Sequence, residues 1–232
     1  MKRSTFSECL TEAFSRRSTE VVIVYFLLQL IVTALLLCSL LRGQYNNAGF
    51  CILSLLLFQL PDLFSRSLHV SLPAATEILF LLFIFAAEIL GELGHFYLRF
   101  LHWDTLLHTT GGLLAAALGF TMIDLLNRSK AGLSPLFCAA SAFCFSMTVG
   151  VFWEFFEFGM DVVFHTDMQK DTVFYQAAIP FLDIGLYDTM GDLLIHFLST
   201  AGFCIFGFFH ICHPHPGSFA GKLIPILRDP LP

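Results

Sequence analysis

Long apolar runs constrain this chain more than any other feature of its sequence. A helix needs roughly 20 apolar residues to cross a bilayer core of about 30 Å. Five runs reach that length, at residues 21–41, 74–94, 104–126, 133–159 and 187–209, and polar, Gly or Pro residues end each of them. The runs predict an all-α integral membrane protein whose helices form a polytopic bundle.

The composition excludes other classes. Hydrophobic residues make up 56% of the 232 residues and charged residues only 13%, whereas a soluble domain carries about 25% charged residues. With a net charge of −6 and 12 scattered basic residues, the chain offers no patch that could follow a nucleic-acid backbone. The seven cysteines include no Cys-x-x-Cys pair, so neither a zinc ribbon nor a disulfide framework is indicated.

A sixth span is less certain from length alone. Residues 48–60 are short for a crossing unless the helix continues through Pro61 and Asp62 to Phe64. Lys and Arg in short loops stay on the cytoplasmic side. Six spans with a cytoplasmic N-terminus leave only Arg42, Arg99 and Lys170 of the 12 basic residues outside, whereas five spans divide them 6 to 6. We therefore predict about six transmembrane helices with both termini in the cytoplasm.

This topology divides the chain into three parts. Residues 1–20 form a cytoplasmic basic segment, residues 21–210 a single transmembrane domain, and residues 211–232 a cytoplasmic tail. The first apolar run is too long for a cleavable signal peptide, so it is expected to stay as an anchor. The basic segment is either a short helix on the inner leaflet or a frayed tail.

Ionisable residues inside spans are costly and therefore indicate function. They gather at four span ends, at spacings of three or four residues that place each set on one helical face. The sets are Glu88, Glu92 and His95; Asp104 and His108, with His102 just before them; Glu154, Glu157 and Asp161; and Asp188, Asp192 and His196. In the six-span topology all four sets lie toward the outer side of the membrane.

The inner parts of these sets contain no Lys or Arg, and several carboxylates at low dielectric cannot all stay ionised without a counter-charge. A divalent metal ion (Mn, Zn, Fe or Mg), shared protons or a cationic substrate would each supply one. Some residues also have a simpler alternative role: Asp104 and Asp188 would suit helix N-termini, and Glu88, His95, His102 and Asp161 would suit the interface. The expected metal ligands are Asp104, His108, Glu154, Asp188 and Asp192, with Glu157 as general base.

Three functions remain open at this point. The first is a metal-dependent enzyme that acts on a lipid-linked or envelope substrate. Metal assistance is the expected mode of catalysis, because the sequence has no Gly-x-Ser-x-Gly elbow and no phosphate-binding glycine loop. The second is a proton- or cation-coupled transporter, and the third is a non-catalytic membrane scaffold. The lipid bilayer is the one partner that the sequence indicates; it names no substrate and no oligomeric state.

Small residues predict where helices approach closely. They are Gly111, Gly112, Ala115, Ala116 and Gly119 in one run and residues 139–142 in the next. Most of the 28 Phe residues are expected to face lipid.

The same motifs resemble the YjdF-like family of bacterial inner-membrane proteins. The resemblance rests on Asp104-x-x-x-His108 followed by two glycines, on Glu154 and Glu157 beside aromatic residues, and on the Tyr-Asp-Thr-x-x-Asp element that ends at Asp192. It covers roughly residues 100–200. A Gly-Thr-Gln-Gly-Asp stretch of that family is absent, and residues 168–171 are its nearest counterpart. A looser similarity is to VanZ-like membrane proteins. Both resemblances imply a bacterial inner-membrane location, and neither supplies a reaction.

Overall fold

The computed structural model describes residues 18–63, 72–127, 132–165, 168–169, 184–214 and 223–224. All regular secondary structure in these residues is helical, as the sequence predicts. Five helices are long and apolar enough to cross a membrane: Thr19–Leu41, Ala74–Leu93, Trp103–Asn127, Pro135–Val163 and Gly185–Cys212. Nearly all of the predicted basic segment 1–20 and most of the tail 211–232 lie outside the described residues. The helices form two compact units that divide between Trp103 and Asp104.

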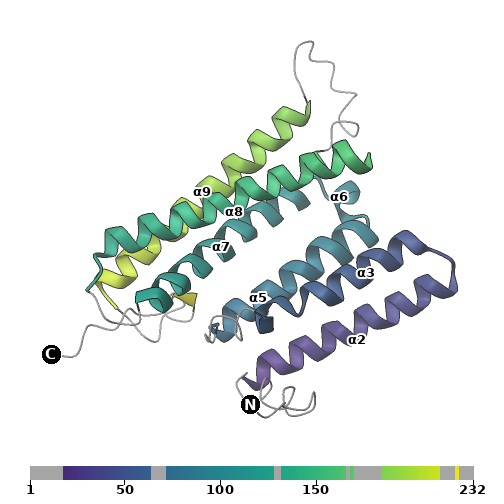
Figure 1. Ribbon diagram of the computed structural model, residues 1–232, viewed down its shortest axis with the longest axis horizontal. Coiled ribbons are helices and arrows are strands. Elements are labelled where there is room, and N and C mark those ends of the chain that lie inside the picture. The colour runs from purple at the N-terminus through teal and green to yellow at the C-terminus, as the bar shows by residue number, and fades with distance from the viewer. Residues whose placement is uncertain are drawn as a thin grey trace, which may run out of the picture. The chain divides into compact units, whose positions relative to one another are not determined.

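The first unit begins with two neighbouring helices, α2 (Thr19–Leu41) and α3 (Tyr45–Leu57) (Figure 1). They are joined by a tight turn in which Gly43 has a φ of 68°, a left-handed conformation that favours glycine. A chain of hydrogen bonds links α2 to the turn that follows α3, because Gln29 donates to the Tyr25 hydroxyl at 2.8 Å and that hydroxyl donates to Gln59 at 2.9 Å. The apolar core of the unit is Tyr25, Leu28, Val32, Cys51, Phe58, Leu81, Ile84 and Ile89.

The segment whose crossing is uncertain from the sequence is helical for most of its length. Helix α3 has 13 residues, too few for a span, but after a turn at residues 58–59 the chain is helical again at residues 60–63. At a rise of 1.5 Å per residue, residues 45–63 extend about 28 Å, close to the thickness of a bilayer core. A sixth crossing remains a prediction.

The third predicted span is not α-helical throughout. Helix α5 (Ala74–Ile84) runs into η1 (Phe85–Leu93), a π-helix with i→i+5 hydrogen bonds, and α6 (Phe96–Arg99) is a separate short helix. His95 lies between them with a φ of 57°. The expectation that Glu88, Glu92 and His95 share one α-helical face is therefore wrong, because the helix ends before His95.

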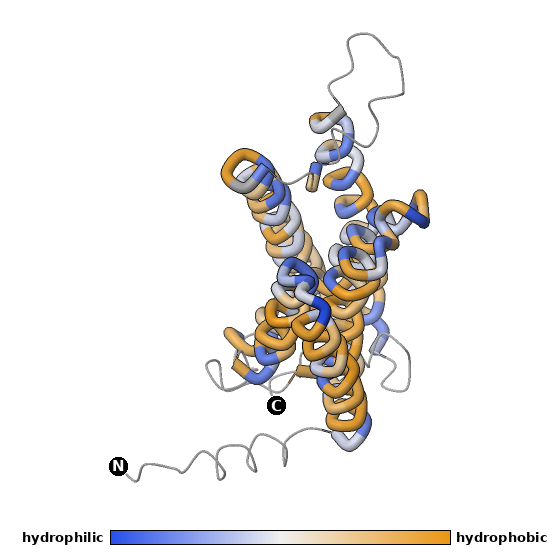
Figure 2. The backbone as a smooth tube through the Cα atoms, turned by 90° about the vertical axis from the view of Figure 1, so that its right-hand side faces the viewer, coloured by the Kyte–Doolittle hydropathy of each residue, from blue (hydrophilic) through white to orange (hydrophobic). Residues whose placement is uncertain are grey.

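The second unit consists of three long helices that lie side by side (Figure 1): α7 (Trp103–Asn127), α8 (Pro135–Phe164) and α9 (Ile184–Cys212). Ser134 caps the start of α8 by accepting from the Phe137 N–H, and Pro135 occupies the first turn. Hydrophobic residues make up most of the length of the helices (Figure 2).

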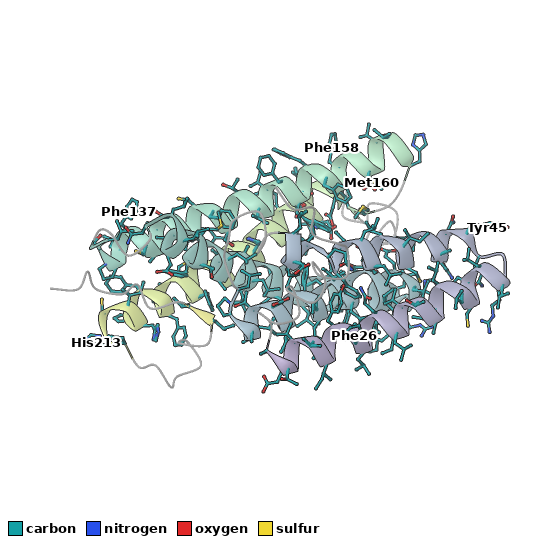
Figure 3. The ribbon with its side chains drawn as sticks, turned by 60° about the horizontal axis from the view of Figure 1, so that its bottom comes forward. Phe26, Tyr45, Phe137, Phe158, Met160 and His213 are labelled. Atoms are coloured by element: carbon teal, nitrogen blue, oxygen red, sulfur yellow. The ribbon has the colours of Figure 1, made fainter. Side chains whose placement is uncertain are left out.

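Helix α8 shows how the second unit divides lipid-facing from inward-facing positions. Its buried residues recur every three or four positions, which is one helical face: Cys138, Ala142, Ser146, Gly150, Glu154 and Glu157. The opposite face is aromatic and exposed, and Phe137 and Phe158 point away from the neighbouring helices (Figure 3). The six exposed Phe residues of α8 therefore face outward, as predicted for this helix.

Small residues set the distance between the helices of the second unit. A Cβ at Gly119 would lie 2.9 Å from the Cα of Ala142 on α8, and a Cβ at Gly112 would collide with Ser199 on α9. A Cβ at Gly150 would lie 2.9 to 3.1 Å from three atoms of the His196 ring. Two of the predicted packing glycines, Gly112 and Gly119, are thus confirmed as points of close helix approach.

Candidate functional site: a carboxylate–histidine group

Three helices of the second unit bring five ionisable side chains together. Asp104 and His108 lie one turn apart on α7, Glu154 and Glu157 lie one turn apart on α8, and Asp192 comes from α9. Because residues three or four apart share a helical face, each helix presents its pair or single residue toward the other two. We call these five residues the carboxylate–histidine group.

His108 is at the centre of the group. Its Nε2 atom lies 3.8 Å from Oδ1 of Asp104 and 3.7 Å from Oδ2 of Asp192. Its Nδ1 atom lies 3.9 Å from Oε1 of Glu154. One imidazole ring therefore faces carboxylates from all three helices.

The group is almost fully removed from solvent. His108 is 8% exposed, and Glu154, Glu157 and Asp192 are each 4 to 5% exposed. Asp104 is the most accessible member, with a side chain that is 18% exposed. The sequences of α7, α8 and α9 contain no Lys or Arg, so histidine is the residue type on these helices that could carry a positive charge beside the carboxylates.

The five residues form two overlapping sets that could each hold a metal ion. One is Asp104, His108 and Asp192, the other is His108, Glu154 and Glu157, and the ligand atoms of each set lie within 4.8 Å of one another. A neutral imidazole has one lone pair and one N–H. His108 can therefore bind a metal through one nitrogen only, and its other nitrogen would then be available to donate a hydrogen bond.

Glu157 has a neighbour that the sequence analysis did not single out. The indole Nε1 of Trp153 donates to Oε1 of Glu157 at 2.8 Å. The signal was present in the sequence, because the two residues are four positions apart on one helix.

Five of the six predicted site residues come together in the structure. Asp188 is the exception: it lies one turn before Asp192 on α9, is half-buried, and belongs to neither metal-binding set. Asp104 lies in the first turn of α7, which agrees with a helix N-terminal role as well as with a ligand role.

Asp161 has the boundary role that its position suggests. Its two carboxylate oxygens accept the backbone N–H groups of Met168 and Gln169 at 2.8 and 2.9 Å. The Gln169 amide then donates to Thr189 Oγ1 on α9 at 2.8 Å. These contacts tie the end of α8 to the start of α9. Asp171 lies outside the described residues.

A second polar contact lies deeper in the same unit. Ser146 Oγ is 3.1 Å from the Gly112 carbonyl oxygen, 2.8 Å from Thr200 Oγ1 and 3.1 Å from His196 Nε2. His196 Nε2 is also 2.9 Å from the Ser146 carbonyl oxygen, an acceptor only, so this nitrogen carries the proton. It cannot act as a base toward the Ser146 hydroxyl, and the pair is no nucleophilic dyad.

Glu88 and Glu92 belong to the first unit, on the π-helix η1.

The comparison with protein families identifies a match: the family model described as "Predicted membrane protein (DUF2238)" aligns with residues 23–213. That range includes every member of the carboxylate–histidine group. No curated protein and no solved structure matches the chain.

Proposed function

We propose that this chain, which belongs to the DUF2238 family of predicted membrane proteins, binds a divalent metal ion in the carboxylate–histidine group and uses it for catalysis. One observation carries the proposal. A buried imidazole lies 3.7 to 3.9 Å from three carboxylates contributed by α7, α8 and α9. Bundle-core metal sites in other helical proteins use the same ligand types on facing helices.

The spacing suits a metal ion better than direct hydrogen bonds. At 3.7 to 3.9 Å the imidazole nitrogens are too far from the carboxylates for hydrogen bonds of normal length. Ligand atoms about 2.05 Å from a tetrahedral ion would be about 3.3 Å apart. The group therefore needs to contract by only about half an ångström per pair to reach ligand distances.

The charge of the group favours the same conclusion. Four carboxylates close together and 4 to 18% exposed cannot all remain ionised without compensation. A divalent ion would offset two negative charges, with carboxylate oxygens as its ligands. Imidazole suits Zn and Fe, whereas carboxylate oxygens suit Mn and Mg, and the group offers both kinds of ligand.

We assign the metal to His108 Nε2, Asp104 and Asp192. Nε2 faces two carboxylates, and Asp104 is the group member that water or a substrate can reach. The Nδ1–H of His108 would then donate to Glu154, the arrangement in which a carboxylate orients a metal-bound histidine. Asp188 belongs to neither metal-binding set, so it is not part of this assignment.

The chemistry that a metal would add is activation of a water molecule, because a bound divalent ion lowers the pKa of its water. Glu157 is the proposed general base, and its hydrogen bond from Trp153 would hold one carboxylate oxygen in place while the other accepts the proton. In the six-span topology the group is in the outer half of a bacterial inner membrane. A lipid-linked or envelope substrate would reach it there.

Elemental analysis of the purified protein tests this proposal. Wild-type protein in detergent should retain about one equivalent of Mn, Zn, Fe or Mg, and Asp192→Asn should lose it. Asp188→Asn is the matched control, because it makes the same change one turn away on α9 and outside both sets. Loss of the metal in both variants, or in neither, would contradict the assignment.

Proton- or cation-coupled transport is the second candidate, and one observation favours it. Buried polar residues continue along α9 from Asp192 to His196, one turn further on. His196 is hydrogen-bonded with Ser146, and the Ser146 hydroxyl is in turn hydrogen-bonded with Thr200. Transport would require a proton gradient and would be lost in Glu154→Gln, whereas metal-dependent turnover should proceed in detergent without a gradient. A pure scaffold would show neither activity, and its Asp192→Asn variant would lose stability only.

A further inference from the structure

A pocket of about 410 Å³ lies in the first unit, between α6 and the first residue of α7. It is lined by Phe96, Arg99, Phe100, Leu101, His102 and Trp103. The volume is within the range of small-molecule sites. No member of the carboxylate–histidine group contributes to it.

The pocket wall carries the cationic chemistry of an anion site. Arg99 and His102 are both exposed, and neither side chain makes a hydrogen bond or ion pair with any described residue. The guanidinium of an arginine is planar and matches two phosphate oxygens at once. Arg99 is also one of only three basic residues that the predicted topology places outside, where most of the acidic side chains lie.

The rest of the wall is aromatic. The ring of Phe96 lies 4.7 Å from that of Phe100 and 4.9 Å from that of Trp103, measured between ring centroids. The indole N–H of Trp103 is buried and has no hydrogen-bond acceptor among the described residues. Trp side chains collect where a membrane meets water, because the indole ring is apolar and its N–H is polar.

From this combination we infer that the pocket binds the phosphate group of a lipid headgroup. The phosphate would pair with Arg99 and His102, and the start of the acyl chains would lie against Phe96, Phe100 and Trp103. Free inorganic phosphate would leave the aromatic wall without a partner, and a neutral lipid would leave Arg99 without one. The inference does not depend on the metal proposal, because no metal ligand lines the pocket.

The two tryptophans of the chain make a direct binding test available. In Trp153→Phe the remaining indole is Trp103, in the pocket wall. The full-length variant, in detergent with EDTA, is titrated separately with three ligands: dioctanoyl phosphatidic acid, dioctanoylglycerol and inorganic phosphate. Dioctanoylglycerol has the same acyl chains as the phosphatidic acid but lacks the phosphate. We expect a saturable change in Trp103 fluorescence with phosphatidic acid. The other two ligands should bind at least tenfold more weakly than phosphatidic acid.

Arg99→Gln in the same background should weaken phosphatidic acid binding at least tenfold. Arg42→Gln is the matched control, because it removes the same charge from an exposed position at the end of α2. Equal responses to phosphatidic acid and dioctanoylglycerol would show interfacial anchoring only and overturn the inference. An unchanged affinity in Arg99→Gln would also overturn it. Because Trp153 contacts Glu157, a thermal shift of the wild-type protein with the same three ligands provides a second readout.

Discussion

Replacement of Gly150 by alanine tests the packing that holds α8 against α9. The added Cβ would lie 2.9, 3.0 and 3.1 Å from three ring atoms of His196, closer than ordinary van der Waals contact. His196 cannot move away cheaply, because its Nε2 is hydrogen-bonded with the Ser146 carbonyl oxygen at 2.9 Å. Overpacking of this kind costs about 1–3 kcal/mol.

Alanine also gains helix propensity over glycine, about 0.5–1 kcal/mol, and a second variant removes this term. Gly159→Ala makes the same change on the same helix, where nothing lies within 4 Å of the new Cβ. The difference between the two variants is therefore the packing cost alone. For a chain of this size, about 1–3 kcal/mol corresponds to a difference in Tm of roughly 2–12 °C.

The assay is thermal unfolding in detergent, followed by circular dichroism at equal protein and detergent concentrations. Gly159→Ala should match or exceed the wild-type Tm, and Gly150→Ala should fall below Gly159→Ala by the amount given above. If the two variants unfold at the same temperature, the close approach of α8 and α9 at His196 is not as described.

Three further predictions concern single contacts. Tyr25→Phe should lower the free energy of unfolding by about 1–2 kcal/mol in thermal denaturation, because it removes the hydroxyl that joins Gln29 and Gln59. Tyr45→Phe, the control at an exposed position, should leave the Tm unchanged. Asp161→Ala should lower the Tm and speed proteolysis between α8 and α9, because two backbone N–H groups lose their acceptor. Asp161→Asn keeps one carbonyl oxygen and should have a smaller effect. Equal proteolysis rates in the wild type and in Asp161→Ala would refute this role of Asp161. Glu154→Gln should weaken metal binding in equilibrium dialysis about 10–100-fold, as expected for a residue that orients a histidine ligand, whereas complete loss would make Glu154 itself a ligand.

Much of the site could be predicted from spacing alone. Asp104 with His108 and Glu154 with Glu157 are one turn apart, so each pair had to share a face of its helix. The apolar runs located the helices because hydropathy reports burial in lipid directly. These parts of the structure depend on residues close together in the chain.

The other parts depend on contacts between distant residues. Asp188 and Asp192 share one face of α9, and sequence spacing does not reveal which of them lies level with His108. That level depends on how α9 is positioned along α7 and α8, which follows from the close contacts at Gly112 and Gly150. Helix η1 left no signal either, because Phe85–Leu93 carries no hydropathy period that distinguishes an i→i+5 ladder from an α-helix.

The central claim is that a metal ion binds beside His108, and Trp153 can report it. In Trp103→Phe, Trp153 is the remaining indole, hydrogen-bonded to Glu157 within the carboxylate–histidine group. Titration of the metal-stripped protein with Mn²⁺ should quench Trp153 fluorescence and saturate at one equivalent. The quenching should persist in Asp188→Asn and disappear in Asp192→Asn. Quenching that is absent, or that survives Asp192→Asn unchanged, would contradict the account.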